Sequence, residues 1–426
     1  MRLLLVHLSD CHFRADRGVS SLLRRADALA DAIAAKCMEV DTCLLALSGD
    51  QAYSGKPAEY TVVDEFVRAV KSRITACRSG LTLHAVAIPG NHDCDFSLNQ
   101  QVRDVVLKSL DVDQLTDNSI VGACTSVQQG FFDWVKTLDP SDPHPFKDPL
   151  IHVRDIALGT ESIRFVLVNS AWCSTLKEQQ GSLKYPPNRL AQVRDLDGQP
   201  AVVVGLVHHP FNWLQADNAR NVRESLESIA DLILTGHEHV SDTYRRTGPR
   251  GEQNDYVEGG VLQDDQGEDS SLNLIVIDTA AQTQQAIQYR LIDGTYRQLS
   301  DQAVTRAFER NKRRLRGEFV LAESFERGVL DDVGVNFTHP RVETLRLRDV
   351  FVYPDARRLR RRPGEEPGQL VLSRDLLSFV MGNKRSLLLG EEQAGKTALA
   401  RTLYRELRHN GVIPVLIGGA QLSKGS

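Results

Sequence analysis

Five apolar, strand-like runs in the chain each end in polar side chains of the kinds that bind metal ions. The polar blocks read SDCHF, SGDQ, PGNHD, VHHPF and TGHEH, in that order. Helix-like stretches at residues 20–37 and 58–76 separate the first three runs, a pattern typical of an α/β fold with parallel strands. Because the carboxyl ends of such strands meet at one edge of a sheet, we expect the blocks to converge on one crevice.

The donors in these blocks are carboxylate and amide oxygens and imidazole nitrogens, without a thiolate. This ligand set suits Mn²⁺, Fe, Zn²⁺ or Ni²⁺ rather than a structural zinc–cysteine site, and its size fits two ions that share one carboxylate. Each block alone also fits ordinary turn chemistry, but five such blocks together do not. The donor residues are Asp10, His12, Asp50, Asn91, His92, His208, His209, His237 and His239.

Further buried strands are predicted downstream, after a less regular region. Residues 128–138 have a helical pattern, and the apolar runs at 162–172, 201–209 and 232–239 read as strands. Three more runs look like consecutive antiparallel strands, so we expect the sheet to finish as a meander. These runs are residues 254–263, 272–279 and 285–292.

Composition indicates a soluble, globular protein of two or three domains. The chain has 426 residues, of which 41% are hydrophobic and 25% charged, as in ordinary globular domains. It has no apolar run of the roughly 18 residues that would indicate a membrane span. The apolar start of the chain is better explained by a buried strand than by a signal peptide, because Asp10 and His12 follow it without a cleavage site.

Cysteine use and charge limit the class of protein further. The seven cysteines are scattered and form no CxxC pair, which argues against a disulfide framework and for a reducing cytoplasm. The net charge of −5 gives no overall attraction to nucleic acid or anionic lipid. Residues 301–362 carry a local basic excess, mostly in NKRRLR and RRLRRR, which we interpret as a solvated helix face and a linker.

In their order and content, the five blocks resemble the signature motifs of calcineurin-like metallophosphoesterases. The resemblance covers roughly residues 1–295 and implies a four-layer α/β/β/α sandwich with a dinuclear metal centre. We therefore expect a metallophosphoesterase domain at residues 1–297. Residues 95–200 match no block, and we expect them to form the cap that sets specificity. Cys11 departs from the bulky apolar residue usual in the first block.

The resemblance also implies a role for each donor. One metal ion would be held by Asp10, His12, Asp50 and His239, and the other by Asp50, Asn91, His208 and His237. His92 corresponds to the catalytic, non-ligand histidine, and we expect Asp93 to orient its ring. A hydroxide activated by both ions would attack the phosphorus of a cyclic nucleotide, a nucleic acid or a small phosphoester, and His92 would assist the leaving oxygen.

A second motif lies near the end of the sequence. GEEQAGKT (Gly390–Thr397) fits the G-x-x-x-x-G-K-[ST] phosphate-binding loop, with an apolar run at 386–389 before it and a helical run at 398–407 after it. Gly390 and Gly395 would shape the loop, Lys396 would reach the terminal phosphates, and Thr397 would ligate Mg²⁺. The motif therefore predicts binding of ATP or GTP with Mg²⁺.

Few residues follow this loop, so we expect the chain to be the front of a longer protein. Residues 298–368 are predicted to be a helical and basic linker, including a helix at 300–316, and 369–426 the first part of a P-loop NTPase domain with a next strand at 412–419. The stretch LRLRDVFVYPDARRL (345–359), followed by this loop, resembles the start of the STAND or NACHT-like NTPase module. In bacteria such modules often carry an N-terminal effector enzyme and act in antiphage defence, and they could self-associate.

Three hypotheses for function remain open from the sequence. The leading one is a metallophosphoesterase fused to a nucleotide-binding NTPase module. The second is an autoinhibited effector module of a STAND-type signalling protein, in which the phosphoesterase is silent until the NTPase region assembles. The third is a metal-dependent nuclease, which would require a basic channel that the charge outside residues 301–362 does not obviously supply.

Overall fold

The computed structural model describes most of the chain, which divides into two compact units. The described residues are 1–15, 21–112, 117–142, 144–194, 196, 198, 200–248, 253–263, 269–299, 303–308, 321–334, 345–358, 368, 370–376, 379–380, 383, 385–409 and 414–417. The first unit comprises residues 1–248 and 252–310, and the second comprises 249–251 and 311–426.

The predicted parallel strands and the helices between them are confirmed in the first unit. The strands are β1 (Arg2–Leu8), β2 (Thr42–Leu47) and β3 (Thr82–Ala87), and the helices are α1 (Ser21–Arg24), α2 (Ala26–Cys37) and α3 (Pro57–Cys77). β2 pairs in parallel with both β1 and β3. α3 begins with a proline at its first turn, where the missing amide hydrogen costs nothing.

The first sheet continues on the other side of β1 with antiparallel strands. Its order is β12-β11-β10-β1-β2-β3, and β13 pairs with β11 off this path. The added strands are β10 (Ser271–Asp278), β11 (Thr283–Ile292), β12 (Thr295–Gln298) and β13 (Thr305–Ala307). Because β13 pairs with β11, the first unit extends beyond residue 297, the end that we predicted.

A second sheet has the order β4-β5-β6-β7-β9-β8. Its strands are β4 (Ile151–Leu158), β5 (Glu161–Val168), β6 (Val202–Val207), β7 (Leu232–Thr235), β8 (Asp242–Thr247) and β9 (Gln253–Glu258). The predicted meander is therefore wrong for β9, which pairs with β7 and β8 rather than with β10. After β9 the chain crosses to the first sheet at Gly259, where an added Cβ would lie 2.7 Å from the Cβ of Ser9.

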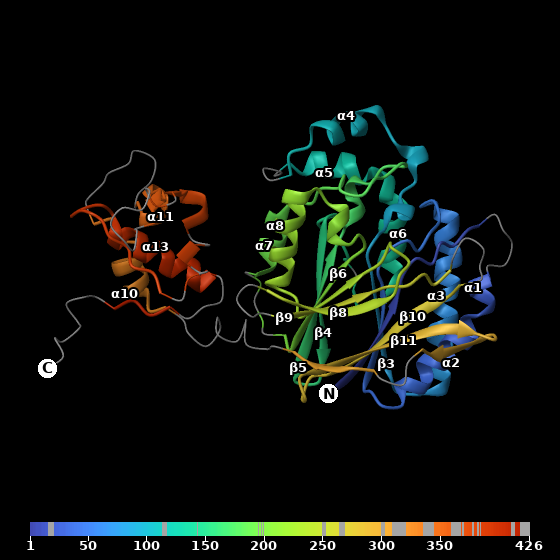
Figure 1. The fold of residues 1–426 in the computed structure, drawn as a ribbon. Helices are drawn as coiled ribbons and strands as arrows, with labels where there is room; N and C mark the ends of the chain where they lie inside the picture. Colours follow the sequence, from blue (N-terminus) through green and yellow to red (C-terminus); the bar gives the residue numbers. More distant parts are fainter. Residues whose placement is uncertain are drawn as a thin grey trace. The chain divides into compact units, whose positions relative to one another are not determined.

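Alternate residues of the central strands show how the layers stack. In β6, Val204 and Leu206 belong to the core between the two sheets, whereas Val203 packs in a second core with α7 (Pro187–Arg194) and α8 (Ala216–Glu227). Helices α2 and α3 cover the outer face of the first sheet, and α7 and α8 cover that of the second (Figure 1). The unit is thus a mixed α/β fold with two sheets, as the resemblance implied.

Residues 95–200, expected to form a cap, contribute to the scaffold as well. β4 and β5 belong to the second sheet, and Trp172 and Tyr185 are among the largest fully buried side chains. The remaining elements of this region are η2 (Phe96–Leu98), α4 (Gln101–Ser109), α5 (Asn118–Thr125), η3 (Ser126–Gln128), α6 (Gln129–Leu138) and η4 (Ser170–Cys173). The helix predicted at 128–138 and the strand at 162–172 are confirmed.

The second unit is small and largely helical. Its elements are α10 (Glu323–Phe325), η6 (Glu326–Leu330), α11 (Leu347–Val350), β14 (Ala356–Arg357), β15 (Leu370–Val371), η7 (Ser373–Asp375) and α13 (Lys396–His409). Arg405 of α13 donates a 2.6 Å hydrogen bond to Asp331 Oδ1, and the rings of Tyr404 and Phe325 are in edge contact. Part of the predicted linker therefore packs on α13.

Several predictions for this part of the chain differ from the structure. The helix after the glycine-rich loop is confirmed as α13, but residues 386–389 form no strand and Leu387 is 84% exposed, because no described segment pairs with them. Residues 414–417 of the expected next strand are likewise irregular. Of the helix predicted at 300–316, the described residues include β13 instead. The NKRRLR run and most of RRRPGEEPGQ lie outside the described residues.

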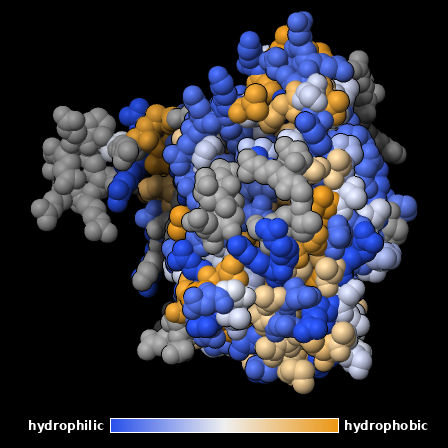
Figure 2. Space-filling model, turned by 90° about the vertical axis from the view of Figure 1, so that its right-hand side faces the viewer, coloured by the Kyte–Doolittle hydropathy of each residue, from blue (hydrophilic) through white to orange (hydrophobic). Residues whose placement is uncertain are grey.

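The described helices are too short or too polar to cross a membrane. On the face drawn in Figure 2, hydrophilic residues predominate and hydrophobic ones form separate small groups. This distribution is typical of a folded, water-exposed surface.

A buried ion pair fastens the two sheets at one end. Arg154 in β4 donates hydrogen bonds to Asp139 Oδ2 (2.8 Å) and to the carbonyl of Ala85 in β3 (2.7 Å). Asp139 also accepts one from the Ala85 amide (2.9 Å). Burial raises the pKa of Asp139, but hydrogen bonds from His84 and Arg154 outweigh it and hold that pKa below its usual range.

We expect Arg154→Met to lower the free energy of unfolding by about 3 kcal/mol, because it leaves a buried carboxylate without its cation. The loss should be largest at neutral pH. It should shrink as the pH falls towards and below the ordinary carboxyl pKa, where Asp139 becomes neutral in the unfolded chain and then in the folded one. Urea unfolding measured at several pH values would test both statements.

Arg68→Met is the matched control, because Arg68 forms an exposed pair with Asp64 one helical turn away. Such pairs contribute about 0.5 kcal/mol or less. An equal decrease in the free energy of unfolding in the two variants would show that Arg154 does not stabilise the contact between the sheets.

Candidate metal centre

The chain turns sharply where the strands of both sheets end, and polar residues occupy these turns. Five of them have a left-handed backbone conformation, which residues other than glycine rarely adopt. Their φ angles are 54° at Asp10, 47° at His12, 56° at Asp50, 74° at His237 and 56° at His239. Strained backbone of this kind clusters at functional sites, and the turns bring these side chains back over the strand ends.

The turns after β1 and β2 are held together by a continuation of the parallel ladder. The amides of Cys11 and His12 both donate to the Asp50 carbonyl, at 2.9 and 3.0 Å, and the Phe13 amide donates to Gln51 at 2.9 Å. A bridge between Phe13 and Ala52 extends the pairing. The first two polar blocks therefore form one rigid platform.

Asp93 fixes the third block to this platform. Its buried carboxylate accepts hydrogen bonds from the amides of Gly90 (2.9 Å), Gln51 (3.2 Å) and Ala52 (2.9 Å) and from the Tyr60 hydroxyl (2.8 Å). Burial, followed by the charge of Asp50, raises the pKa of Asp93 to about 6. Asp93 thus joins the turns after β2 and β3.

The structure corrects our expectation that Asp93 orients the His92 ring. His92 lies in η1 (Asn91–Asp93), and its Nδ1 is 2.8 Å from the carbonyl oxygen of Tyr53. The Asp93 carboxylate is already engaged by backbone amides, so the Tyr53 carbonyl takes over the orienting contact. A carbonyl only accepts, so Nδ1 of His92 carries a hydrogen.

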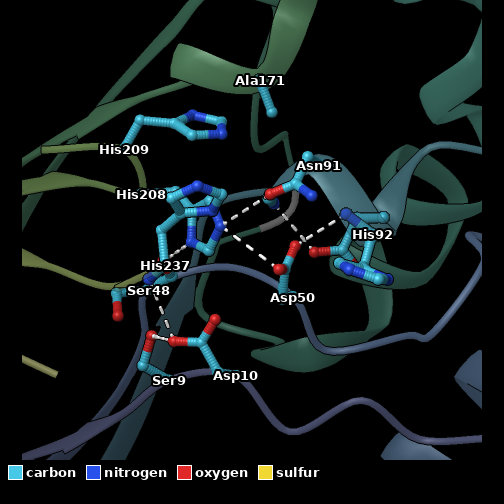
Figure 3. Close-up of polar contacts among 12 residues, drawn as sticks. Ser9, Asp10, Ser48, Asp50, Asn91, His92, Ala171, His208, His209 and His237 are labelled. Atoms are coloured by element: carbon cyan, nitrogen blue, oxygen red, sulfur yellow. Dashed lines mark hydrogen bonds and ion pairs between the residues drawn. The ribbon is translucent and has the colours of Figure 1, made fainter. Parts of the chain in front are cut away.

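One group of donors gathers around Asp10. Asp10 Oδ1 lies 3.3 Å from His239 Nε2 and 3.9 Å from His12 Nε2, and these two ring nitrogens are 3.4 Å apart. The other carboxylate oxygen, Oδ2, accepts hydrogen bonds from the Ser9 hydroxyl and from the His237 amide. Figure 3 shows Asp10 with these two contacts, from the turn after β1.

A second group gathers around Asp50, next to the first. His208 Nε2 lies 3.3 Å from Asp50 Oδ2 and 3.2 Å from Asn91 Oδ1. The His92 amide donates to Asp50 Oδ1 at 2.8 Å. In Figure 3, Asp50 lies between His208 and His92, with the side chain of Asn91 beside it.

His237 and His209 complete the imidazole cluster. The His237 ring centroid is 5.1 Å from that of His208, 4.6 Å from that of His209 and 4.1 Å from Trp213 in η5 (Phe211–Trp213). His12 and His92 are also in edge contact at 4.6 Å. All seven residues that the resemblance implied as ligands are therefore in one cluster, with His92 at its edge.

Burial and mutual attraction set the charges in this cluster. Burial raises the pKa of Asp50, but His208 outweighs it and holds that pKa well below its usual range. Burial lowers the pKa of His208, yet Asp50 raises it overall to about 10. Burial and the nearby imidazoles of His209 and His208 lower the pKa of His237 to about 3. The lowered pKa of Asp50 favours an ionised carboxylate, the form that binds a cation.

The donor set fits divalent metal ions. Four groups of three residues have donor atoms within 4.8 Å of one another: Asp10, His12 and His239; Asp10, Asp50 and His208; His12, Asp50 and His92; and His208, His209 and His237. Asp10 Oδ1 is buried, and its contacts among the described residues are the ring nitrogens of His239 and His12 rather than a well-formed hydrogen bond, although burying such an atom is costly. A divalent cation between these facing carboxylate oxygens and imidazole nitrogens would be coordinated by them.

Comparison with known families identifies the fold. The profile of the calcineurin-like phosphoesterases matches residues 3–241, which is more than half of the chain. The chain belongs to the calcineurin-like phosphoesterase family. All five polar blocks lie within the matched region, and the fold and gathered donors agree with a metal-dependent hydrolase.

Distant likenesses to solved structures were also found. Vps29 from Entamoeba histolytica, solved as a single mutant, is 12% identical over 71% of this chain and 99% of its own, with a TM-score of 0.29. The sulfate thiohydrolase SoxB from Thermus thermophilus is 16% identical over 71% of this chain and 56% of its own, with a TM-score of 0.34. No curated protein matched the sequence.

In this calcineurin-like phosphoesterase, sequence reasoning missed the partner of His209. Glu178 Oε1 lies 2.9 Å from His209 Nε2, and the Glu178 side chain is only 7% exposed. Nδ1 of His209 lies 2.9 Å from the Ser170 hydroxyl. This pair holds His209 beside His237, but Glu178 lies in a region without any motif.

Three glycines of the phosphoesterase blocks make room for the donors. A Cβ on Gly49 would lie 2.2 Å from His208 Nδ1, and one on Gly236 would lie 2.1 Å from Ser9 Oγ. A Cβ on Gly90 would lie 2.1 Å from Asp50 Oδ1 and 2.7 Å from His208 Nε2. The glycines are therefore required for the close approach of the turns.

We expect Gly90→Ala to remove most of the bound metal while leaving the fold intact. Gly90 has φ −106° and ψ −173°, which alanine adopts without strain, so the clash with Asp50 and His208 is the main effect. After loading with Mn²⁺ and dialysis, elemental analysis should find at least one ion per chain fewer than in the wild type.

Gly122→Ala is the matched control, because an added Cβ in this helical position has nothing within 4 Å. Its Mn²⁺ content should equal that of the wild type. Equal metal content in both variants would contradict the role of the Asp50–His208 pair as a metal-ion site.

Proposed function

We propose that the first unit is a phosphoesterase that hydrolyses phosphodiesters or phosphomonoesters with two divalent metal ions. One ion would be held by Asp10, His12, Asp50 and His239, and the other by Asp50, Asn91, His208 and His237. When bound, two such ions supply an activated hydroxide and neutralise charge on the phosphoryl oxygens. Mn²⁺, Fe, Zn²⁺ and Ni²⁺ are all compatible with these donors.

The observation that supports this proposal best is the central position of Asp50. One carboxylate oxygen faces His208, and the other accepts the His92 amide, while Asp10 and His12 lie in the adjacent group. A carboxylate between two donor groups is the arrangement that one residue needs to serve two ions. Its pKa, held well below the usual range, keeps it ionised for that purpose.

His92 is the residue that would handle the proton of the leaving group. Its Nδ1 hydrogen is committed to the Tyr53 carbonyl, so only Nε2 is left to act on a substrate. The ring is half-buried and lies against His12. A protonated His92 would donate from Nε2 to the leaving oxygen, a role that contributes roughly 10²- to 10⁴-fold in rate.

Purified protein with Mn²⁺ is expected to hydrolyse bis-p-nitrophenyl phosphate. Asp50→Asn should abolish turnover and lower bound Mn²⁺, because it removes the charge shared by both donor groups. His92→Ala should lower kcat by roughly 10²-fold or more but keep the metal content, because no metal role is proposed for its side chain. Release of p-nitrophenol and elemental analysis would measure these effects.

His144→Ala is the control, since His144 is exposed and outside the cluster. Its turnover should match the wild type. Wild-type turnover in both Asp50→Asn and His92→Ala would reject the proposed site.

We further propose that the second unit binds a nucleoside triphosphate with Mg²⁺ through residues 390–397. Gly395, at φ +75°, lies directly before α13, and Lys396 Nζ donates to the Gly390 carbonyl at 2.9 Å. The lysine thus folds back over the loop, where it would meet phosphates, and Thr397 follows at the start of α13. Exposed backbone amides at a helix N-terminus are suited to phosphate.

Lys396→Ala is expected to weaken binding of a fluorescent ATP analogue at least tenfold, because it removes the cation that meets the terminal phosphates. Arg408→Ala, at the other end of α13, should leave the binding unchanged. Titration followed by fluorescence anisotropy would measure both affinities. Equal binding by the wild type and Lys396→Ala would contradict a phosphate-binding loop.

The STAND-type effector and the nuclease remain proposals, and both can be tested by assays on the same purified protein. An autoinhibited effector would hydrolyse bis-p-nitrophenyl phosphate faster when ATP is added, and Lys396→Ala would remove that stimulation. A nuclease would degrade DNA or RNA in the presence of Mn²⁺. Neither alternative changes the assignment of the metal ligands.

A further inference from the structure

A stacked arginine lies beside the metal centre, outside the residues that the five motifs assign. Arg14 follows His12 by two residues, directly after the bridge between Phe13 and Ala52. Its guanidinium carbon lies 3.2 Å from the centroid of the Tyr53 ring. Both side chains are half-buried, so the cation is placed at the rim of the site rather than in the core.

Tyr53 connects this cation to His92. The Tyr53 carbonyl accepts from His92 Nδ1, and the two rings are 5.3 Å apart. The Tyr53 ring is also 6.4 Å from that of His12. Moving outward from the metal donors, the order is therefore His12, His92, Tyr53 and the guanidinium of Arg14.

The position suits an anion that is separate from the reacting phosphate. Stacking uses the face of the guanidinium, whereas its five N–H donors lie in the plane and can serve more than one partner. The ring holds the side chain in one orientation, so less entropy is lost when an anion binds. The reacting phosphoryl group itself would be occupied by the metal ions and His92.

We propose that Arg14 on Tyr53 forms a subsite for a second phosphate carried by the leaving group of the substrate. The inference rests on the proposed function, in which His92 acts on the leaving oxygen, because Tyr53 and Arg14 continue outward from His92. The substrate class is then a phosphoester whose leaving group bears a further phosphate. A nucleotide strand and a small pyrophosphate compound both have this chemistry.

The test compares substrates that differ by one phosphate. With Mn²⁺, kcat/KM would be measured for thymidylyl-thymidine and for its two forms with an added 5′- or 3′-terminal phosphate. A second arm compares dithymidine diphosphate with thymidine 5′-(p-nitrophenyl phosphate), which share the thymidylyl group. The first arm detects a nucleotide strand and the second a small pyrophosphate.

The wild type should favour the doubly phosphorylated member of at least one arm by about tenfold, the scale of one charge-assisted hydrogen-bond pair. Arg14→Gln should reduce that preference to about one, and Arg14→Lys, which keeps the charge but not the planar fork, should give an intermediate value. Arg73→Gln is the control, because Arg73 is an exposed partner of Asp31 away from the site, and it should keep the preference.

Turnover of bis-p-nitrophenyl phosphate, which lacks a second phosphate, reports whether each variant keeps a folded site. A wild type that hydrolyses this ester but shows no preference in either arm would overturn the subsite and leave the proposed function standing. Equal losses on all substrates in Arg14→Gln would also overturn it, because Arg14 would then act only by holding Tyr53 and His92. Loss of all wild-type turnover would reject both proposals.

Discussion

The candidate metal centre depends on backbone turns that few residues tolerate. Five of its seven proposed ligands have positive φ, a conformation that costs a side-chain-bearing residue about 1 kcal/mol or more. These turns reverse the chain within one or two residues of each strand end, so the side chains point back over the sheet edge. A relaxed loop in their place would spread the donors over a larger volume.

The cost of these turns is offset by contacts that act between loops. The turn after β1 continues the parallel ladder onto the turn after β2, and Asp93 fastens the turn after β3 to the same platform. On the other side, the Leu262 and Gln263 amides donate to the carbonyls of Ser9 and Asp10. The two sheets beneath supply the packed core, so contacts within the fold hold the strained turns.

Features that depend on neighbouring residues in the chain could be predicted from the sequence. The strands β1 to β3, the helices between them and the polar residues that end each strand follow from local patterns. The ligand set followed from the motif resemblance, and the structure gathers it where strands of both sheets end. Helix α13 was predicted for the same reason, because its sequence pattern is local.

Features that depend on distant contacts could not be predicted. β9 was assigned to the wrong sheet, because its sequence fits any buried strand and only its pairing with β7 decides the matter. The strand expected at 386–389 also needs a neighbour to pair with, and none is present among the described residues. Glu178 and Tyr53 were missed because their contacts with His209 and His92 span many residues.

For Asp93, the motif was located correctly but the role predicted for the residue was wrong. The resemblance placed it next to His92, where a carboxylate is a natural partner for an imidazole, yet its oxygens accept hydrogen bonds from three backbone amides and the Tyr60 hydroxyl instead. Burial raises its pKa to about 6, and its hydrogen bonds to backbone amides give it a structural role in holding the turns together. The Nδ1 hydrogen of His92 is instead donated to the neutral carbonyl of Tyr53. This contact fixes the ring orientation without adding negative charge beside a phosphate. An anionic orienting group would repel the phosphate ester that we propose as the substrate, whereas a neutral backbone carbonyl does not.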